Sequence, residues 1–108
     1  MDREATLRKA CTWIEKAAGE GVGLVCFGET FAPAYPVWTC RTNGASFDDP
    51  DQKRAHALYL DQSVEIASHL DGVLECAADN KCAVVLGVAE RDGHTIYCSR
   101  VMISAQGE

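Results

Sequence analysis

The sequence has no cluster of basic residues, no long apolar run and no signal peptide. Its 10 Lys and Arg are outnumbered by 16 Asp and Glu, and with a net charge of −6 we expect no nucleic-acid partner. The longest apolar run, Ala83–Ala89, is far shorter than the roughly 20 residues that cross a bilayer, so we expect no membrane segment. The N-terminus, Met1-Asp2-Arg3-Glu4, lacks the basic start and apolar core of a secretory signal. We therefore expect a soluble, cytoplasmic protein.

Cysteines in a Cys-x-x-Cys arrangement are also missing. Zinc sites and thioredoxin-like motifs need such a pair because two ligands must converge from one tight turn, so we expect no metal. Without a secretory signal, the even number of cysteines does not indicate disulfides. Cys11 and Cys76 fall on apolar helix stripes, and Cys26 and Cys98 lie inside strand patterns, so we expect them to pack as small hydrophobic side chains. The six cysteines are Cys11, Cys26, Cys40, Cys76, Cys82 and Cys98.

The apolar content suits one small domain. Hydrophobic residues make up 47% of the 108 residues, which excludes disorder, and half of such a chain could bury little surface. Asp2 and Asp49-Pro50 mark helix starts, and Ser68 with Asp71 has the spacing of a capping box. Two strands apolar on both faces, with helices between them and a hairpin at Asp92-Gly93, predict an α/β fold with a mixed sheet. The periodicity predicts helices over 3–18, 49–60 and 68–80, strands over 22–27, 83–89 and 95–104, and a long loop over 30–46.

Glu29 follows directly after the first predicted strand. Ligand sites in open α/β sheets form beyond the carboxyl ends of strands, because the loops converge there. Apolar and aromatic neighbours, among them Phe27, Phe31 and Tyr35, would disfavour the charged form of this carboxyl group, which suits a general base or acid. The alternative is a solvated or helix-capping glutamate, and position alone does not decide between the two.

The residues around Glu29 resemble the first signature of the nitrilase family. That signature reads Phe-Pro-Glu-x-Phe-x-Pro-Gly-Tyr-Pro-x-Trp, and this chain has Phe-Gly-Glu-Thr-Phe-Ala-Pro-Ala-Tyr-Pro-Val-Trp over 27–38. The segment over 2–10 looks like the first helix of the family, and Gly-Val-Ala-Glu-Arg-Asp-Gly over 87–93 looks like its hairpin. A further stretch, Ser63-Val64-Glu65-Ile66, also matches, so the likeness covers essentially all of the chain in one collinear order.

The resemblance implies a four-layer α-β-β-α sandwich fold and a Cys-Glu-Lys triad, with Glu29 as the general base. It implies hydrolysis of a nitrile to a carboxylic acid and ammonia through a cysteine thioimidate and thioester, with no cofactor. It also implies that the full-length protein forms homo-oligomers. Tyr35 is a candidate substrate-binding residue, whereas Trp38 is expected to pack beneath the loop.

The triad lysine and cysteine are not found in this sequence. In the family the lysine follows the hairpin in a Lys-Leu-Lys-Pro-like string, and the cysteine lies further on beside Trp-Glu. Lys53 and Lys81 stand in helical surface contexts. Cys40 is close to Glu29 along the chain, but we interpret it as a pocket-lining residue at most. The chain over 1–108 is therefore expected to be the N-terminal part of one carbon-nitrogen hydrolase domain, incomplete at both ends and inactive alone.

Several positions depart from the family pattern. Gly28 replaces a proline and would loosen the backbone that aims Glu29, while Ala34 replaces a glycine and would be strained if its φ were positive. Cys98 stands where an asparagine is usual. Glu90 is expected to support the hairpin, with Arg91 or Arg100 as ion-pair partners. The three histidines are expected at the surface: His56, His69 and His94.

Two alternatives to a nitrilase stay open at this point. The same triad acts on amides in the amidase and carbamoylase branch of the superfamily, although Tyr-Pro-Val-Trp after Glu-Thr-Phe favours the nitrilase branch. The chain could also be a non-catalytic, truncated module, because it lacks two of the three triad residues.

Overall fold

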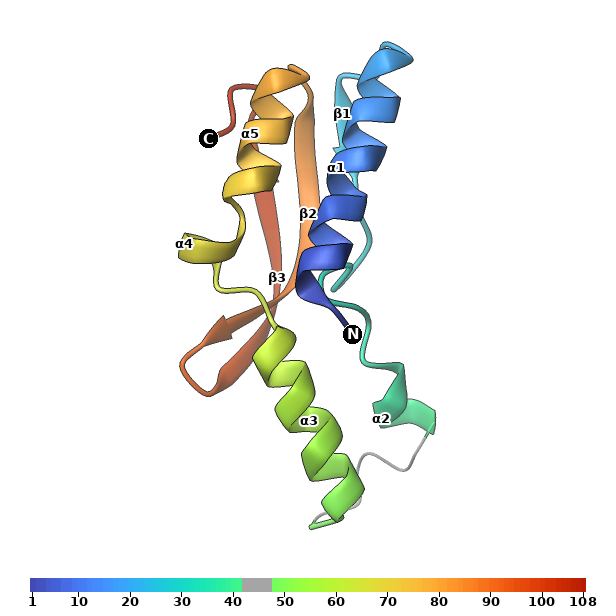
Figure 1. Ribbon diagram of the computed structural model, residues 1–108, viewed down its shortest axis with the longest axis vertical. Helices are drawn as coiled ribbons and strands as arrows, with labels where there is room; N and C mark the ends of the chain where they lie inside the picture. The colour runs from blue at the N-terminus through green and yellow to red at the C-terminus, as the bar shows by residue number, and fades with distance from the viewer. Residues whose placement is uncertain (42–47) are drawn as a thin grey trace.

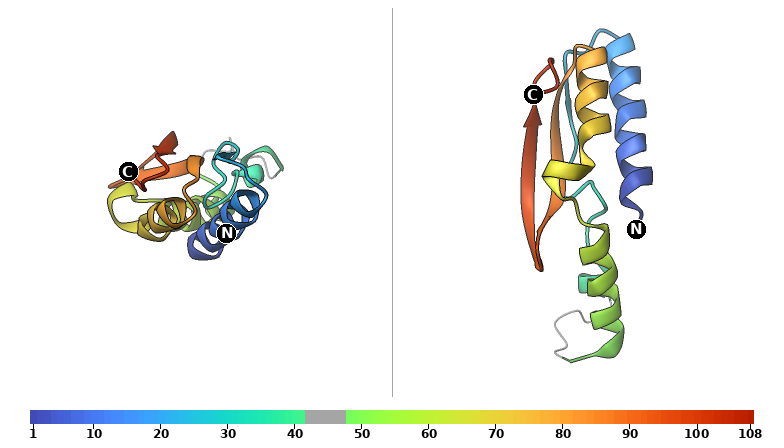
Figure 2. Two further views of the ribbon diagram at one scale, coloured as in Figure 1. Left: turned by 90° about the horizontal axis from the view of Figure 1, so that it is seen from above. Right: turned by 60° about the vertical axis from the view of Figure 1, so that its left-hand side comes forward.

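The computed structural model describes residues 1–41 and 48–108 and consists of a three-stranded sheet with helices on one face (Figures 1 and 2). The strand order is β1-β2-β3, with β1 parallel to β2 and β3 antiparallel to β2. Helices α1 and α5 lie side by side over the sheet, and α3 extends beyond its end (Figure 2). The mixed α/β architecture predicted from the sequence is confirmed. Its elements are α1 Arg3–Gly19, β1 Leu24–Cys26, α2 Val37–Arg41, α3 Pro50–Gln62, α4 Ile66–His69, α5 Asp71–Asp79, β2 Ala83–Asp92 and β3 Thr95–Ile103.

Two helix starts form as the sequence predicts. The Asp2 carboxylate accepts a hydrogen bond from the Ala5 N–H at 2.8 Å and caps α1. The Asp49 carboxylate accepts from the N–H groups of Asp51 and Gln52, and Pro50 occupies the first turn of α3, where its missing N–H costs nothing.

The capping box expected at Ser68 is wrong. Ser68 lies inside the short helix α4, where its hydroxyl bonds to the Glu65 carboxylate at 3.4 Å, and Leu70 precedes α5 without a side-chain cap. Asn80 ends α5 as predicted. The long loop predicted over 30–46 contains helix α2, and its part over 42–47 lies outside the described residues.

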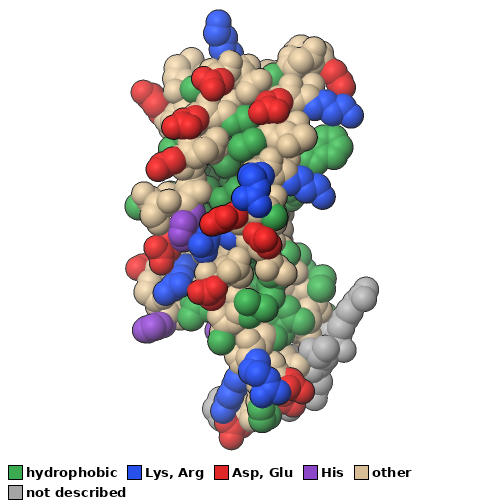
Figure 3. All heavy atoms as spheres, in the orientation of Figure 1, with side chains coloured by type: hydrophobic (Ala, Val, Ile, Leu, Met, Phe, Trp, Pro, Cys, Tyr) green, Lys and Arg blue, Asp and Glu red, His purple; other side chains and the backbone are tan. Residues whose placement is uncertain are grey.

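The face of the sheet beneath α1 and α5 holds the core. Apolar residues alternate along β2, so that Val84, Leu86 and Val88 are fully buried there. Ile14 of α1 and Val73 of α5 pack against them. Figure 3 shows this side of the molecule from outside, with acidic and basic side chains both spread over the helices, as expected for the solvent face of an amphipathic layer.

The opposite face of the sheet is open among the described residues. Leu24 is 53% exposed and Met102 76% exposed, and Cys26 is exposed as well. The expectation that the first strand is buried on both faces is therefore wrong, and so is that of buried Cys26 and Cys98. The reason is that no described element covers this side (Figure 2). Strand patterns apolar on both faces indicate a partner layer, which residues 1–41 and 48–108 do not supply.

One edge of β2 pairs in turn with three separate segments of the chain. After β1, Ala32 forms a parallel bridge to Val88, and Val64 forms another to Glu90. The Ala32 carbonyl accepts from the Ala89 N–H at 2.8 Å, and the Ala89 carbonyl accepts from the Val64 N–H at 2.7 Å. The chain between β1 and Ala32 therefore leaves the sheet and returns to it.

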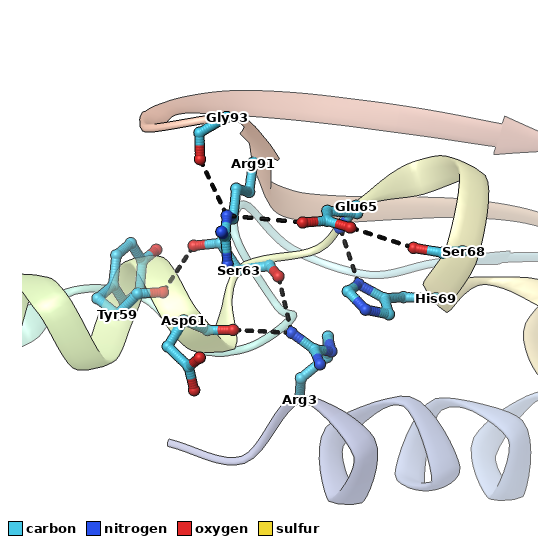
Figure 4. A network of polar contacts seen from close by, with 9 residues as sticks. All are labelled: Arg3, Tyr59, Asp61, Ser63, Glu65, Ser68, His69, Arg91 and Gly93. Carbon is cyan, nitrogen blue, oxygen red and sulfur yellow. Dashed lines mark hydrogen bonds and ion pairs between the residues drawn. The ribbon is translucent and has the colours of Figure 1, made fainter.

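A polar network fixes the third of these segments (Figure 4). The Arg3 guanidinium donates to the carbonyls of Asp61 and Ser63 at 2.9 and 3.0 Å, which ties α1 to the end of α3. Arg91 of β2 pairs with the Glu65 carboxylate at 3.6 Å. These contacts hold the chain around Val64 against β2, although each exposed ion pair contributes little by itself.

His69 closes this network from α4, and it is half-buried rather than at the surface as predicted. Its Nδ1 accepts a hydrogen bond from the Glu65 N–H at 2.9 Å, so this nitrogen must be unprotonated (Figure 4). Burial, and then the positive charge of Arg3, lower the pKa of His69 below its usual 6.5. The neutral form is thus favoured in the folded protein.

We expect the protein to lose stability as the pH falls below about 6.5. The unfolded chain then binds a proton at His69 that the folded chain resists, so the contribution is present above the unfolded pKa and lost as pH falls through the folded one. Urea unfolding at pH 7 and pH 5 measures this. His69→Gln should show a smaller drop between the two pH values than the parent, whereas His94→Gln, in the exposed hairpin turn, should drop as the parent does. Equal drops in the parent and His69→Gln would contradict the prediction.

Candidate functional site

Glu29 lies in the segment that leaves the sheet after β1. The Phe27 N–H donates to the Val85 carbonyl at 2.8 Å, and pairing with β2 resumes where the Ala32 N–H donates to the Gly87 carbonyl at 3.3 Å. Between these two points the chain bulges outward over Gly28–Phe31, with the Phe31 N–H returning to the Gly28 carbonyl at 3.3 Å. Glu29 thus stands at the carboxyl end of a parallel strand, as predicted, and is held by backbone pairing on both sides.

Thr30 adopts a backbone conformation that few threonines adopt. Its φ is +44°, in the left-handed region, and the residue is buried. A β-branched residue is strained in this conformation, typically by about 1–3 kcal/mol, and residues with strained backbones concentrate at functional sites. Glu29, the residue before Thr30, is exposed.

The bulge rests directly on Gly87 of β2. A Cβ added at Gly87 would lie 2.1 Å from the Gly28 carbonyl oxygen and 3.0 Å from the Glu29 Cα. Only glycine leaves room for this approach, which explains the glycine that interrupts the apolar run of β2. Gly28 itself has no positive φ and no atom within 4 Å of a Cβ added there, so the close contact depends on Gly87.

Two hollows open beside Glu29. One, of about 320 Å³, lies between the bulge and β3 and is lined in part by Glu29, Gly87, Cys98 and Arg100. The other, of about 240 Å³, lies on the side of the following loop and is lined in part by Glu29, Tyr35 and Cys98. Glu29 and Cys98 border both hollows, so a small molecule in either one would lie beside both residues.

The aromatic residues of the loop have two different surroundings: one borders a hollow and the other packs against α3. Tyr35 is 51% exposed and borders the smaller hollow. Trp38 packs edge-on against Tyr59 and His56 of α3, with ring centroids 6.3 and 6.4 Å apart, as expected for a residue beneath the loop. The buried Tyr59 donates its hydroxyl to the Ala34 carbonyl at 3.1 Å, and burial raises the pKa of this phenol.

Other sequence expectations have mixed outcomes. Apolar enclosure of Glu29 is wrong for the described residues, because the open face of the sheet leaves the side chain exposed. Ala34 has no positive φ, so its substitution for glycine carries no strain. Cys40 is an exposed residue of α2 and borders neither hollow described above. Its role as a lining residue stays a prediction without support from this geometry.

The charged candidates also differ in part from expectation. Glu90 supports the hairpin by accepting a hydrogen bond from the Ser99 hydroxyl, as predicted. Its expected partner Arg91 pairs instead with Glu65, because neighbouring strand residues point to opposite faces. Lys53 lies on the exposed surface of α3, paired with Asp48, whereas Lys81 lies in the turn after α5 rather than in a helix.

The family comparison agrees with this geometry over the whole chain. The model of the carbon-nitrogen hydrolase family matches residues 1–108. The chain belongs to this carbon-nitrogen hydrolase family. It is 35% identical to an arylacetonitrilase of Aspergillus niger over an alignment of 109 residues. That alignment covers 100% of this chain and 31% of the relative. An aliphatic nitrilase of Rhodococcus rhodochrous and a nitrilase of a Bacillus strain are 33% and 32% identical, with 29% and 30% of their lengths covered.

The hydrolase chain thus spans about a third of the length of these curated relatives. Within its described part, no helix is long and apolar enough to cross a membrane. Over residues 1–41 and 48–108, no group of three or more His, Cys, Asp or Glu side chains is placed to hold a metal ion.

Sequence reasoning missed the partners of Glu29 across the sheet. Gly87 was recognisable only as a break in an apolar strand, and Arg100 only as an ion-pair partner for Glu90. Placing them beside Glu29 requires the register in which Gly87 faces Arg100 and Ala89 faces Cys98. The turn signal in the sequence would not have given this register. With Asp92-Gly93 at the centre of the turn, Arg91 would pair with His94, whereas the turn is Gly93-His94 and Asp92 pairs with Thr95. The predicted centre of the turn is therefore wrong by one residue.

Proposed function

We propose that this chain is the N-terminal part of a nitrilase whose full-length form hydrolyses a nitrile to a carboxylic acid and ammonia, with Glu29 as general base. The observation that carries the proposal is the exposed Glu29 carboxylate, held at the strand end by pairing on both sides and bordering two hollows. The printed names of the relatives, arylacetonitrilase and aliphatic nitrilase, favour the nitrile over the amide as substrate class.

The proposed reaction uses a cysteine thiol from the part of the domain outside this chain. Glu29 takes the thiol proton, the thiolate sulfur bonds to the nitrile carbon, and the proton passes from Glu29 to the nitrile nitrogen to give a thioimidate. Water, deprotonated by Glu29, adds to that carbon. Glu29 then gives the proton to the nitrogen, the carbon–nitrogen bond breaks, and ammonia leaves with a thioester remaining. A second water attacks the thioester and releases the acid and the thiol. A lysine ammonium, also outside the chain, would stabilise the negative charge that develops on nitrogen.

The open face of the sheet fits this proposal. Its exposed Leu24 and Met102 would be covered by the second sheet of the sandwich that the family resemblance implies. The same layer would enclose Glu29, which this chain leaves exposed, and would bring the cysteine and lysine to it. The isolated chain of 108 residues should therefore release no ammonia from a nitrile.

A chimera tests the proposal. Residues 1–108 replace the matching segment of the Aspergillus niger arylacetonitrilase, to which they are 35% identical, and ammonia release from an arylacetonitrile is measured. Circular dichroism and size-exclusion chromatography against the unmodified arylacetonitrilase establish folding and assembly first. We expect turnover in the chimera and none in the isolated chain. A folded, assembled chimera without turnover would contradict the proposal, and turnover of the amide alone would favour the amidase branch.

A further inference from the structure

Cys98 and Arg100 lie on the face of the hairpin against which the Glu29 bulge packs. Gly87 and Ala89 share one face of β2, since they are two residues apart, and the Cβ position of Gly87 points at Gly28 and Glu29. In the antiparallel register, Arg100 lies opposite Gly87 and Cys98 opposite Ala89. Side chains directly opposite one another project on the same side of a sheet. Cys98 is thus presented to the bulge from the neighbouring strand.

The two hollows also place Cys98 and Glu29 side by side. Each hollow is bordered by both residues, although the two hollows share no other lining residue. Cys98 therefore stands between the hollows with Glu29. A thiol in this place has a hydrogen to donate and faces an acceptor with two oxygens.

We propose that Cys98 is a positioning residue for Glu29, donating a hydrogen bond from its thiol to the carboxylate and holding that carboxylate toward β3. The inference rests on the proposed role of Glu29 as the base, but the contact itself can be tested without any hydrolysis. A donor from β3 fixes the one part of Glu29 that the backbone pairing of the bulge leaves free, its side chain.

The electrostatics of Cys98 agree with a thiol that donates to a carboxylate. Desolvation is the largest of the effects that raise the pKa of Cys98, followed by the charge of Glu29 and by hydrogen bonding with Glu29. Arg100 acts in the opposite sense and lowers it. These are the charged groups that face the thiol, and the phenols of Tyr35, Tyr59 and Tyr97 border the smaller hollow. Removing the charge of Glu29 should therefore increase the thiolate fraction of Cys98.

Alkylation by iodoacetamide measures the thiolate fraction of Cys98 directly. The thiolate sulfur forms a bond to carbon and iodide leaves, so below the thiol pKa the rate follows the thiolate fraction. The 108-residue chain and its Glu29→Gln variant are labelled at pH 8, and the rate at each cysteine is read by peptide mass spectrometry. We expect Cys98 to react about threefold faster or more in Glu29→Gln, since one pKa unit is a tenfold change in thiolate.

Cys26 is the matched control because it is exposed on β1 of the same sheet. Its rate should be the same in both proteins. An unchanged rate at Cys98 would overturn the proposal, and so would an equal rise at Cys26 and Cys98, which would report a general loosening of the fold. Neither result depends on whether the intact protein is a nitrilase, so failure here is distinct from failure of the proposed function.

The chimera described above separates positioning from packing. Cys98→Ala removes the donor and should lower kcat about fivefold with KM unchanged, the effect of losing one hydrogen bond of ordinary strength. Cys98→Ser keeps a donor of similar size and should retain most of the parent kcat. A parent-like kcat in Cys98→Ala, or an equal loss in Cys98→Ser and Cys98→Ala, would overturn the proposal.

Discussion

The Glu29→Gln variant of the chimera is expected to release ammonia about 10²–10⁴ times more slowly than the chimera itself, the range by which a positioned general base accelerates a reaction. The amide of Gln has nearly the shape of the carboxylate but cannot take a proton from a thiol or from water. Glu29 is exposed, and its side chain forms no part of the core cluster, so the replacement should leave the fold intact. The loss would therefore come from chemistry rather than from unfolding.

Glu75→Gln is the matched control for this experiment. Glu75 is an exposed glutamate of α5, on the helical layer and not among the residues that border either Glu29 hollow. The Glu75→Gln substitution removes the same charge from the same chain and should leave the rate of ammonia release unchanged. Retained turnover in Glu29→Gln would contradict the assignment of the base, whereas equal losses in both variants would point to an effect of net charge.

The Gly87→Ala substitution is expected to have the largest effect on stability. The added methyl group would lie 2.1 Å from the Gly28 carbonyl oxygen, so the bulge or β2 must shift. Neither can move freely, because Ala32 and Val85 pair the two segments on either side. Overpacking of this kind costs about 1–3 kcal/mol of unfolding free energy, and here the obstruction is backbone rather than a flexible side chain. Urea unfolding of the 108-residue chain measures the loss.

Gly28→Ala provides the comparison. Gly28 is the other partner in the same contact, but a Cβ added there meets no atom within 4 Å and its φ is not positive. Its free energy of unfolding should stay within about 0.5 kcal/mol of the parent, as for most substitutions on a surface. In the chimera, Gly87→Ala should also lower kcat because Glu29 is displaced. Equal stability of the two alanine variants would show that the bulge does not rest on Gly87.

Local signals account for the parts of the fold that could be predicted from the sequence. Asp2 and Asp49-Pro50 start helices through contacts within a few residues, so their patterns are read directly. The exposure of β1 could not be read in this way, because it depends on whether a second layer covers the sheet. The capping role given to Ser68 failed for a related reason. Pairing of Val64 with β2 fixes the chain just before α4, and Ser68 falls inside that helix.

In the candidate site, too, only the features with a local signal could be predicted from the sequence. Glu29 was found from its place after a strand and from a family signature, both of which are local. The contact with Gly87 and the approach of Cys98 join residues about 60 to 70 positions apart and follow from the register of the sheet. Single residues in the sequence carry no signal for such a register, and the turn signal at Asp92-Gly93 would pair Arg91 with His94 instead of Asp92 with Thr95.

The pairing of Phe27 and Ala32 with β2 also bears on how this segment tolerates change. Main-chain hydrogen bonds define where the bulge begins and ends, so the place of Glu29 depends little on the side chains next to it. Gly28 and Ala34, which differ from the family signature, occupy positions where the backbone neither crowds them nor demands a positive φ. Side chains next to Glu29 can therefore change while the backbone that carries the carboxylate stays in register. The edge of β2 thus fixes the position of the bulge through the main chain alone.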